Sequence, residues 1–489
     1  MQLSELFLNG FILLIFFIIY MSNYSFLGEN YFLENSAAIH LFHNVAKDLP
    51  IIDYHNHLNI NHLLDNQKFD NIAQVWVVND PYKHRAMRIE GVPEYFISGN
   101  ATDKEKFMAW ANVFPQTIGN PLFHWSCLEL KKIFGIDYLL NVDNAEVVWN
   151  HCNKLLETDD FRNNSLLDKF NVDTLCTSDD WFDDLSKHKN ATENANFIVL
   201  PSLRSDAALN IEMWISNGFI ERLEESTTIA ISSLEKLQEA LEIRIQYFNE
   251  NGCNLADQAL DSGFKFRLPA LNEAQALFKK WLLEKKLTNE EVVGFKSYIL
   301  NFIGKSFAQK GWTLQLHIGA HRFTSSRLRE LAGSAGGYAA IGNTADISGV
   351  ASLLDSLEKD KLLPNIILFT LNPADNSTFA TLTGSFSQDN VPAKVQFGPA
   401  WWYNDHFDGI KNQIIATASY SILHRFIGMT TDSRSILSFS RHDYFRRILC
   451  NIIGEWVEKG LVPNDEILLK NLVTNICYTN SKNMIENGK

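Results

Sequence analysis

Two histidines on either side of Asn56 form the clearest candidate for chemistry, in the run Ile51-Ile52-Asp53-Tyr54-His55-Asn56-His57-Leu58. The apolar, β-branched start of this run predicts a short strand, and side chains two residues apart on a strand point to the same face. His55 and His57 should therefore converge, and two neutral imidazoles can hold one divalent metal with positions left for a carboxylate and a substrate. The alternative is a pair of solvated loop histidines, so a partner elsewhere in the chain must decide.

The candidate partner is Asp432, far downstream. It follows residues 426–431, a short apolar run that predicts a buried strand, and it lies two residues before Arg434. A carboxylate at a strand end can be a third metal ligand or a base for proton transfer. Alone, an aspartate in this place more often caps the next helix. Together with the two histidines it suggests a barrel whose first and last strands are neighbours.

The elements that must position these residues alternate between helices and short strands. Amphipathic helical stretches dominate two zones, residues 69–170 and 211–310, which we interpret as helical insertions. Short apolar runs that end in polar residues favour buried parallel strands; they are residues 172–177, 197–203, 313–318, 366–371, 394–397 and 426–431. From residue 313 onward the spacing fits βα units. We therefore expect one (β/α)8 TIM-type barrel domain over residues 21–489.

Further polar groups follow the predicted strands, where barrels carry their catalytic side chains. His317 ends one strand, Arg204 follows another, and Asn372, Asp375 and Trp401 follow two more. Each has an ordinary structural alternative, since Asn372 and Asp375 can cap a helix and Trp401 can simply pack. The agreement of several strand ends favours an active site. A helix is also expected from about Arg441, with Phe445, Leu449, Ile452 and Trp456 on its packed face and Arg446 and Arg447 in structural or solvated positions.

Composition limits the class of function. The 489 residues carry a formal net charge of −14, and 46% of them are hydrophobic. This charge and the lack of a basic cluster argue against nucleic-acid binding. An acidic substrate would need arginines within the site, because the net charge gives it no long-range attraction. The six cysteines show no CxxC or framework spacing, which fits reduced thiols in a cytoplasmic protein.

The N-terminus contains a hydrophobic run over residues 11–20. It lacks the Lys or Arg expected before a signal-peptide core, and it is shorter than the ~20 residues of a membrane span. Met21 follows and opens a polar segment. We interpret residues 1–20 as an upstream mistranslation and Met21 as the initiator, with no stable membrane association; export or anchoring by this run is the alternative.

Several long motifs resemble those of uronate (glucuronate) isomerases, a branch of the amidohydrolase superfamily. Besides the histidine motif they are Tyr82-Lys83-His84-Arg85-Ala86-Met87-Arg88, Met108-Ala109-Trp110-Ala111-Asn112, Leu314-Gln315-Leu316-His317-Ile318-Gly319-Ala320, Leu371-Asn372-Pro373, Val395-Gln396-Phe397-Gly398, Trp401-Trp402-Tyr403-Asn404-Asp405, Met429-Thr430-Thr431-Asp432-Ser433-Arg434-Ser435 and the run 441–450. The resemblance extends from about Tyr31 to Tyr478.

The resemblance implies a (β/α)8 barrel that interconverts aldose and ketose hexuronates, D-glucuronate with D-fructuronate and D-galacturonate with D-tagaturonate. It implies one divalent metal, for which zinc is the expectation, on His55, His57 and Asp432. Asp432, His317 and Tyr82 are the expected catalytic groups; Arg88, Arg204, Arg434 and Trp401 are the expected substrate contacts. Self-association into a homo-oligomer is left open.

Some positions depart from the family pattern. Asn56 stands where a cysteine is common, but it points away from the histidine pair. The loop His321-Arg322-Phe323-Thr324-Ser325 and Asn343 also differ, which leaves the preferred uronate open. Two other classes of function would leave different marks in the sequence. A metal-dependent hydrolase should show more ligands for a second metal, and a catalytically dead scaffold should have lost some of His55, His57, Asp432 and Arg434.

Overall fold

The computed structural model describes residues 26–487, and two parallel sheets form its centre. The first sheet holds β1 (Ile51–Asp53), β2 (Val172–Cys176) and β3 (Ile198–Leu200). The second runs in the order β10 (Val395–Phe397), β9 (Asn365–Thr370), β6 (Thr313–Ile318), β5 (Leu255–Leu260) and β4 (Leu203–Arg204). The sheets join because Asp179, just after β2, bridges to Leu203 in parallel fashion.

The barrel closes between the two ends of the chain. Residues 426–431 were predicted as a strand, but they form no regular ladder and contact β1 through side chains as well as backbone. Tyr54 donates its hydroxyl to the carbonyl of Gly428 (2.9 Å), and the Asp432 amide donates to the His55 carbonyl (3.0 Å). Asp53 accepts the Thr431 amide (2.9 Å). Strands β3 and β4 are separated by only two residues and together form one barrel strand. Residues 426–431 then take the eighth barrel position, and the predicted TIM-type barrel is confirmed.

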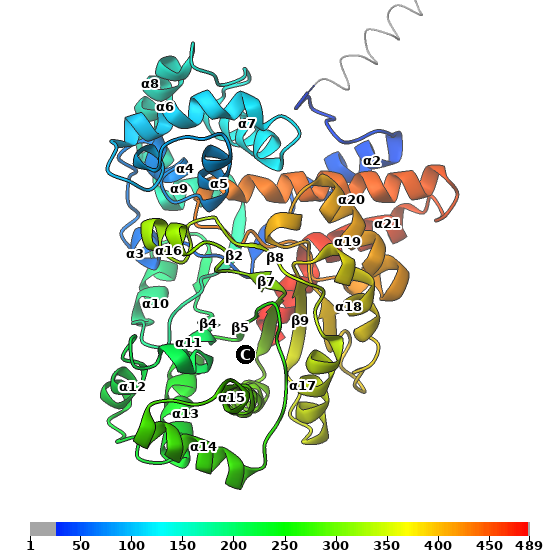
Figure 1. The fold of residues 1–489 in the computed structure, drawn as a ribbon. Coiled ribbons are helices and arrows are strands. Elements are labelled where there is room, and N and C mark those ends of the chain that lie inside the picture. Colours follow the sequence, from blue (N-terminus) through cyan, green and yellow to red (C-terminus); the bar gives the residue numbers. More distant parts are fainter. Residues whose placement is uncertain (1–25, 488–489) are drawn as a thin grey trace, which may run out of the picture.

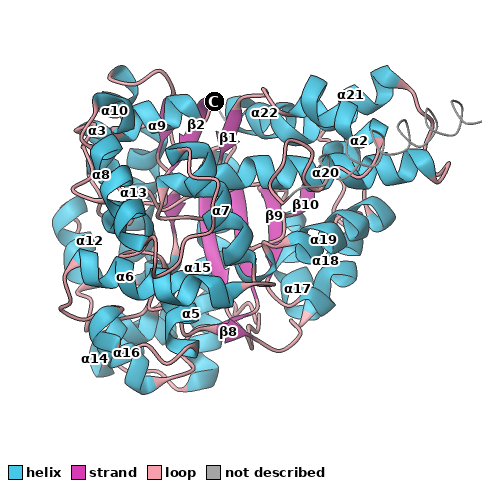
Figure 2. Ribbon diagram, turned by 90° about the horizontal axis from the view of Figure 1, so that it is seen from above, coloured by secondary structure: helices cyan, strands magenta, loops and turns pink. Residues whose placement is uncertain are grey.

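Helices surround the strands, as the view from above shows (Figure 2). The helices between barrel strands include α10 (Ser186–Glu193), α12 (Phe219–Thr227), α13 (Leu234–Glu250), α14 (Leu271–Glu284), α15 (Asn289–Gln309), α17 (Ile347–Lys359), α18 (Asn376–Leu382) and α19 (Phe407–Tyr420). Short helices α2 (Ser36–Leu41), α3 (Ile60–Leu64) and α11 (Asp206–Leu209) precede or follow barrel strands, and α21 (Glu466–Thr474) and α22 (Asn480–Asn487) end the described chain.

The region between β1 and β2 is helical, as the sequence indicated for residues 69–170. It holds α4 (Ile72–Trp76), α5 (Pro81–Ile89), α6 (Asp103–Val113), α7 (Pro121–Phe134), α8 (Ala145–Leu156) and α9 (Asn163–Lys169), grouped at one end of the barrel in Figure 1. Asp80 caps α5 by accepting the amides of Tyr82 and Lys83, and Pro81 fits the first helical turn. These hydrogen bonds at the start of α5 fix the position of Tyr82 at the mouth of the barrel.

The zone 211–310 requires a correction, because it is not purely a helical insertion. Strand β5 lies inside it and pairs with β4 and β6 as a central member of the barrel. The sequence hid this strand because Asp257 and Gln258 interrupt its apolar run. Asp257 faces the barrel interior, where a polar side chain is wanted at the active end.

Helix α20 (Arg441–Glu458) crosses the barrel beside α21 (Figure 1). Phe445, Leu449 and Ile452 are buried, which confirms the predicted packing face. Arg446 donates to the carbonyls of Leu49 (2.7 Å) and Pro50 (2.8 Å), just before β1. It is structural, as expected, but buried rather than solvated. The helix therefore holds the first strand in place from the other end of the chain.

Between β6 and α17 the chain forms a small cap. The hairpin strands β7 (Ala320–His321) and β8 (Ala340–Ile341) flank helix α16 (Ser326–Ala332). Arg85 of α5 and Tyr403 both donate to the carbonyl of Ala339, at 3.0 and 2.7 Å. The cap is thus fastened to α5 and to the loop after β10.

No helix within residues 26–487 combines the length and the apolar character needed to cross a membrane. The hydrophobic run at residues 11–20 and the interpretation of Met21 as initiator lie outside the described residues.

Candidate metal centre

His55, His57 and Asp432 meet at the barrel end. Their ligand atoms all lie within 4.8 Å of one another. Oδ1 of Asp432 is 3.0 Å from Nε2 of His57 and 3.4 Å from Nε2 of His55. Two imidazole nitrogens and a carboxylate oxygen are a donor set that suits a divalent metal with open positions for substrate. The residues therefore fit the metal that the sequence suggested.

The backbone at Asp432 is held in an unusual conformation. Its φ is +45°, in the left-handed region that non-glycine residues seldom adopt. The hydrogen bond from its amide to the His55 carbonyl and the bond from Thr431 to Asp53 maintain this geometry. Such strain costs of order 1–3 kcal/mol and persists where the surroundings enforce it, often at functional sites. Here it turns the carboxylate toward the two imidazoles.

The charges of the site favour a bound cation. Burial raises the pKa of Asp432, but hydrogen bonds and charges from His55 and His57 outweigh burial and hold that pKa well below its usual value. Burial lowers the pKa of His57 to about 4. Burial also opposes protonation of His55, yet the Asp432 hydrogen bond and the Asp257 charge raise the pKa of His55 above 6.5. An ionised carboxylate between imidazoles attracts positive charge to this point.

Trp401 and His317 flank the metal centre. Trp401 donates its indole N–H to Oδ2 of Asp432 (2.7 Å), so both oxygens of the carboxylate are oriented. The His317 ring lies 4.9 Å from the His55 ring and 4.7 Å from that of Trp401. Within residues 26–487, Nε2 of buried His317 has no hydrogen-bond partner. Burial, then the charge of His55, lowers the pKa of His317 well below 6.5, so it is a neutral imidazole.

A small cavity of about 30 Å³ opens beside Asp432. It is lined by Asn79, Asp80, Pro81, Tyr82, Lys83, Trp125, Glu129, Asp432, Ser433, Arg434, Ser435, Ser438 and Arg441. Burial raises the pKa of Tyr82 well above 10, so its hydroxyl keeps its proton. The cavity thus joins a carboxylate, a phenol and an exposed arginine.

The predicted arginines are not equivalent. Arg434 is exposed on the cavity wall, and Arg204 lies at the end of β4 with its Nε bound to Asp206 (3.0 Å). Arg88, also expected to contact the substrate, binds protein groups in this structure. Its guanidinium makes two hydrogen bonds with Glu94, at 2.8 and 2.7 Å, and a third with the carbonyl of Gly336. These contacts join α5 to the cap.

Two further groups escaped the sequence analysis. Asp257, at 5% exposure, accepts a hydrogen bond from Ser178 (3.2 Å), and burial raises its pKa to about 6 despite the nearby His55 and Arg204. Arg441 pairs with buried Asp405 and donates to the Thr431 carbonyl, next to Asp432. The Asn251-Gly252 turn before β5 could have indicated that a strand follows, and Asp257 lies on that strand. No local pattern marks Arg441.

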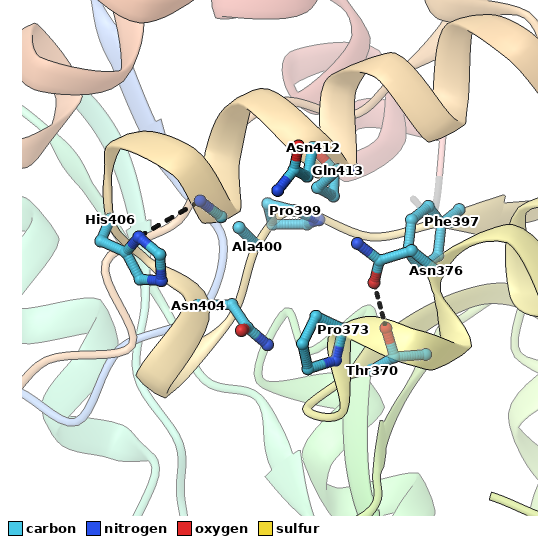
Figure 3. A pocket seen from close by; sticks show the side chains of 11 residues that line it. Thr370, Pro373, Asn376, Phe397, Pro399, Ala400, Asn404, His406, Asn412 and Gln413 are labelled. Atoms are coloured by element: carbon cyan, nitrogen blue, oxygen red, sulfur yellow. Dashed lines mark hydrogen bonds between the residues drawn. The ribbon is translucent and has the colours of Figure 1, made fainter. Parts of the chain in front are cut away.

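A second pocket lies beside the loop after β10, which also carries Trp401; Figure 3 shows the side chains that line it. Its volume is about 120 Å³, and residues from α18, α19 and the end of β10 line it. Gln413 donates to the carbonyl of Gly398 (2.6 Å), and Asn404 donates to that of Leu371 (2.7 Å). Among its lining residues, all within the described chain, only His406 is titratable. The residues around this second pocket pack against the loop that carries Trp401. They lack the acid–base groups of the metal centre.

A family model for glucuronate isomerase matches residues 23–485. The chain belongs to this family. A uronate isomerase from Caldanaerobacter subterraneus subsp. tengcongensis is 44% identical over 459 residues, which cover 94% of this chain and 98% of the relative.

Solved structures of the family agree with this assignment. A uronate isomerase from Thermotoga maritima has a TM-score of 0.88 at 34% identity and covers 94% of this chain and 99% of its own. A glucuronate isomerase from Caulobacter crescentus has a TM-score of 0.86 at 25% identity, over 94% of this chain and 97% of its own. The resemblance inferred from the sequence motifs is therefore confirmed along nearly the whole chain.

Proposed function

We propose that this protein is a uronate isomerase that interconverts D-glucuronate with D-fructuronate and D-galacturonate with D-tagaturonate in uronate catabolism. The observation that carries the proposal is the meeting of Asp432 with His55 and His57 at the edge of a cavity that also holds Tyr82 and Arg434. Membership of the glucuronate isomerase family supports the same chemistry.

Asp432 carries the proton in this proposal. Aldose–ketose isomerisation removes the proton from C2, forms a cis-enediol between C1 and C2, and returns a proton to C1. A carboxylate whose pKa lies well below the normal value is ionised at neutral pH and can accept that proton. Trp401 holds the second carboxylate oxygen, so the base keeps one orientation through both transfers.

The neighbouring oxygens need a donor as their charge changes. Tyr82 is protonated before the reaction starts, so its hydroxyl can donate a proton to the carbonyl oxygen at C1 while the enediol forms. It recovers a proton when the C2 hydroxyl becomes the ketone. Neutral His317 offers a further hydrogen bond. A divalent metal on His55, His57 and Asp432, for which we propose zinc, would polarise the substrate oxygens as a Lewis acid.

The carboxylate of the uronate needs a planar cationic partner. Arginine supplies two parallel N–H donors in a rigid fork, which suits this group. Arg434 lies on the cavity wall. The charges of Asp206, Asp257 and Asp432 raise the pKa of Arg204 against the effect of burial. We assign carboxylate binding to Arg434 first, with Arg204 toward the sugar hydroxyls and Trp401 on the sugar face.

The test is a product assay with the full chain after zinc loading. D-glucuronate and D-galacturonate are supplied separately, and the keto-uronates are measured by NMR. The expected result is D-fructuronate or D-tagaturonate, with proton exchange at C2. Folded, metal-loaded protein that leaves both uronates unchanged but cleaves a lactone, amide or phosphoester would instead support the hydrolase alternative.

Three wider assignments belong with this function. We assign residues 21–489 to one barrel domain, and the contacts between β1 and residues 426–431 support a single barrel. A cytoplasmic location fits six cysteines that are all free thiols, five of them buried. The chain is a candidate homo-oligomer, which light scattering of the purified protein would test.

A further inference from the structure

A polar layer lies inside the barrel, beneath the candidate metal centre. Strand register aligns Asp257 with Gln315, Gln315 with Ile367, and Ile367 with Gln396. Gln315 is two residues before His317, and alternate residues of a strand share a face. His317 points into the barrel, where its ring contacts that of His55. Gln315 and its aligned neighbours therefore face the interior directly below the metal-site histidines.

The polar atoms of this layer lack protein partners. Gln315 is fully buried at 0% exposure, and within residues 26–487 neither its Nε2 nor its Oε1 has a hydrogen-bond partner. The same holds in the described chain for Oε1 of Gln396 and for Nδ1 of His55. Buried carboxamides are almost always hydrogen-bonded, either to protein or to ordered water. A fully buried amide with both ends open calls for a small polar ligand.

We propose that Gln315 and Asp257 hold an internal water against Nδ1 of His55, and that Gln315 is a positioning residue for this metal-binding imidazole. A buried water needs about two to four polar partners, and these side chains supply donors and acceptors from adjacent strands. Metal-bound histidines generally donate their second ring N–H to a carboxylate, a carbonyl or water, which fixes the ring and its tautomer. The inference rests on the metal site of the proposed function.

Strand register places Asp257 directly beside Gln315, at the same level of the barrel. One oxygen of Asp257 already accepts from Ser178, so its carboxylate is oriented from the loop after β2. The water would transmit this orientation to His55 without a direct contact between the two side chains.

The first test compares Gln315→Met with Leu316→Met. Both replace a fully buried side chain of β6, but Leu316 faces the opposite side of the strand and makes no water contact in this proposal. Zinc affinity is measured by competition with a chromophoric chelator, and the metal-free melting temperature by calorimetry. Gln315→Met should weaken zinc binding about 10–100-fold, whereas Leu316→Met should leave it nearly unchanged.

The alternative is that the Gln315 amide has no water partner and only destabilises the fold. Gln315→Met should then raise the melting temperature and keep wild-type zinc affinity, which would overturn the proposal. Loss of stability with unchanged zinc affinity would also overturn it, since Gln315 would then serve the fold alone. The variant His57→Ala provides the reference for a protein without a working metal site. If the wild type binds zinc no better than this variant, the proposed function is contradicted, and the result does not bear on the role of Gln315 in particular.

A high-resolution crystal structure of the wild-type chain decides the case even if Gln315→Met fails to fold. We expect a water within hydrogen-bond distance of the Gln315 amide and of Nδ1 of His55. Direct contact of Nδ1 with a protein atom, or a dry interior around the Gln315 amide, would exclude the proposed bridge.

Discussion

At the scale of single residues, Asp432 combines three properties that are usually separate. It contacts both metal-site histidines, it is held by Trp401, and its backbone is in the left-handed region. A helix cap would need only a hydrogen bond to a backbone amide. The side chain instead points to the imidazoles, which excludes the capping alternative raised by the sequence.

Asp432→Asn should remove most isomerase activity. The amide keeps the shape, but it deletes the base and the anionic metal ligand. We expect kcat to fall by at least the ~10²-fold typical of losing a general base, with little change in melting temperature. Steady-state assays would be compared with Asp408→Asn, a substitution at an exposed aspartate of α19. Near-normal turnover of Asp432→Asn would reassign the proton transfer to Tyr82 or His317.

Arg434→Lys should act mainly on substrate binding. Lysine keeps the charge but loses the planar fork that matches a carboxylate. KM for the uronate should rise by at least as large a factor as kcat falls, about tenfold or more for the loss of a charge-assisted pair. The same measurement on Arg204→Lys would rank the two arginines. A KM that changes only for Arg204→Lys would move the carboxylate to that residue.

At the scale of elements, α5 and the cap must stay together for Tyr82 to keep its place. Gly337 has a φ of +79°, and a Cβ added there would collide with the carbonyl of Pro81. Glycine lets the cap backbone lie flat on the first turn of α5. Arg85 and Tyr403 then both donate to the carbonyl of Ala339, two residues further along the cap.

Gly337→Ala should therefore loosen the cap and displace Tyr82. We expect kcat/KM to fall about tenfold or more, because a shift of ~1 Å at a catalytic group can cost up to ~10²-fold. Gly333→Ala is the matched control: its φ is also positive, at +69°, but a Cβ there meets no atom within 4 Å. Equal losses in both variants would point to backbone strain alone. Proteolysis of residues 321–342 would report the loosening.

Helix α20 buries a histidine that should make the fold sensitive to acid. Burial, then the charges of Arg446 and Arg441, lowers the pKa of His442 well below 6.5. Below that pH the unfolded chain takes up a proton that the folded chain refuses. Stability should therefore fall as pH decreases through 6.5, by up to about 1.4 kcal/mol per pH unit from this group.

His442→Gln removes this titration and should lose less stability between about pH 7.5 and pH 5. Urea denaturation at both pH values measures the difference, with exposed His62→Gln as the reference substitution. An identical pH dependence in His442→Gln and the wild type would show that other groups govern acid sensitivity.

At the scale of the whole molecule, one seam joins residues nearly four hundred positions apart. Asp53 accepts the Thr431 amide (2.9 Å) and hydroxyl (2.5 Å), and Thr430 also donates to it. His55 and Asp432 lie directly after the two sides of this seam. We therefore expect closure of the barrel to bring the metal-site residues together.

Asp53→Ala should open the seam. Each buried donor left without an acceptor costs about 1–3 kcal/mol, so we expect the free energy of unfolding to fall by roughly 3 kcal/mol or more. Zinc affinity should fall with it, since His55 and Asp432 lose their common frame. Exposed Asp65→Ala controls for the loss of a carboxylate. Full zinc affinity in a destabilised Asp53→Ala would separate closure from metal binding.

The sequence by itself determined the barrel and the core of the site. Short apolar runs predicted most strands, and the spacing of His55 and His57 with a distant Asp432 predicted that these three side chains meet. These inferences succeeded because strand periodicity and strand-end position are local properties that the residues state directly.

Only the tertiary structure decided the partners of those residues. Strand β5 stayed hidden because Asp257 faces a polar interior, where the apolar pattern of a strand breaks down. Arg88 looked free until Glu94 and the cap occupied its guanidinium, and Trp401 revealed its bond to Asp432 only once two strand ends met. Hydrogen-bond partners and pKa shifts depend on which distant segments the closed barrel brings together, and no local pattern encodes that.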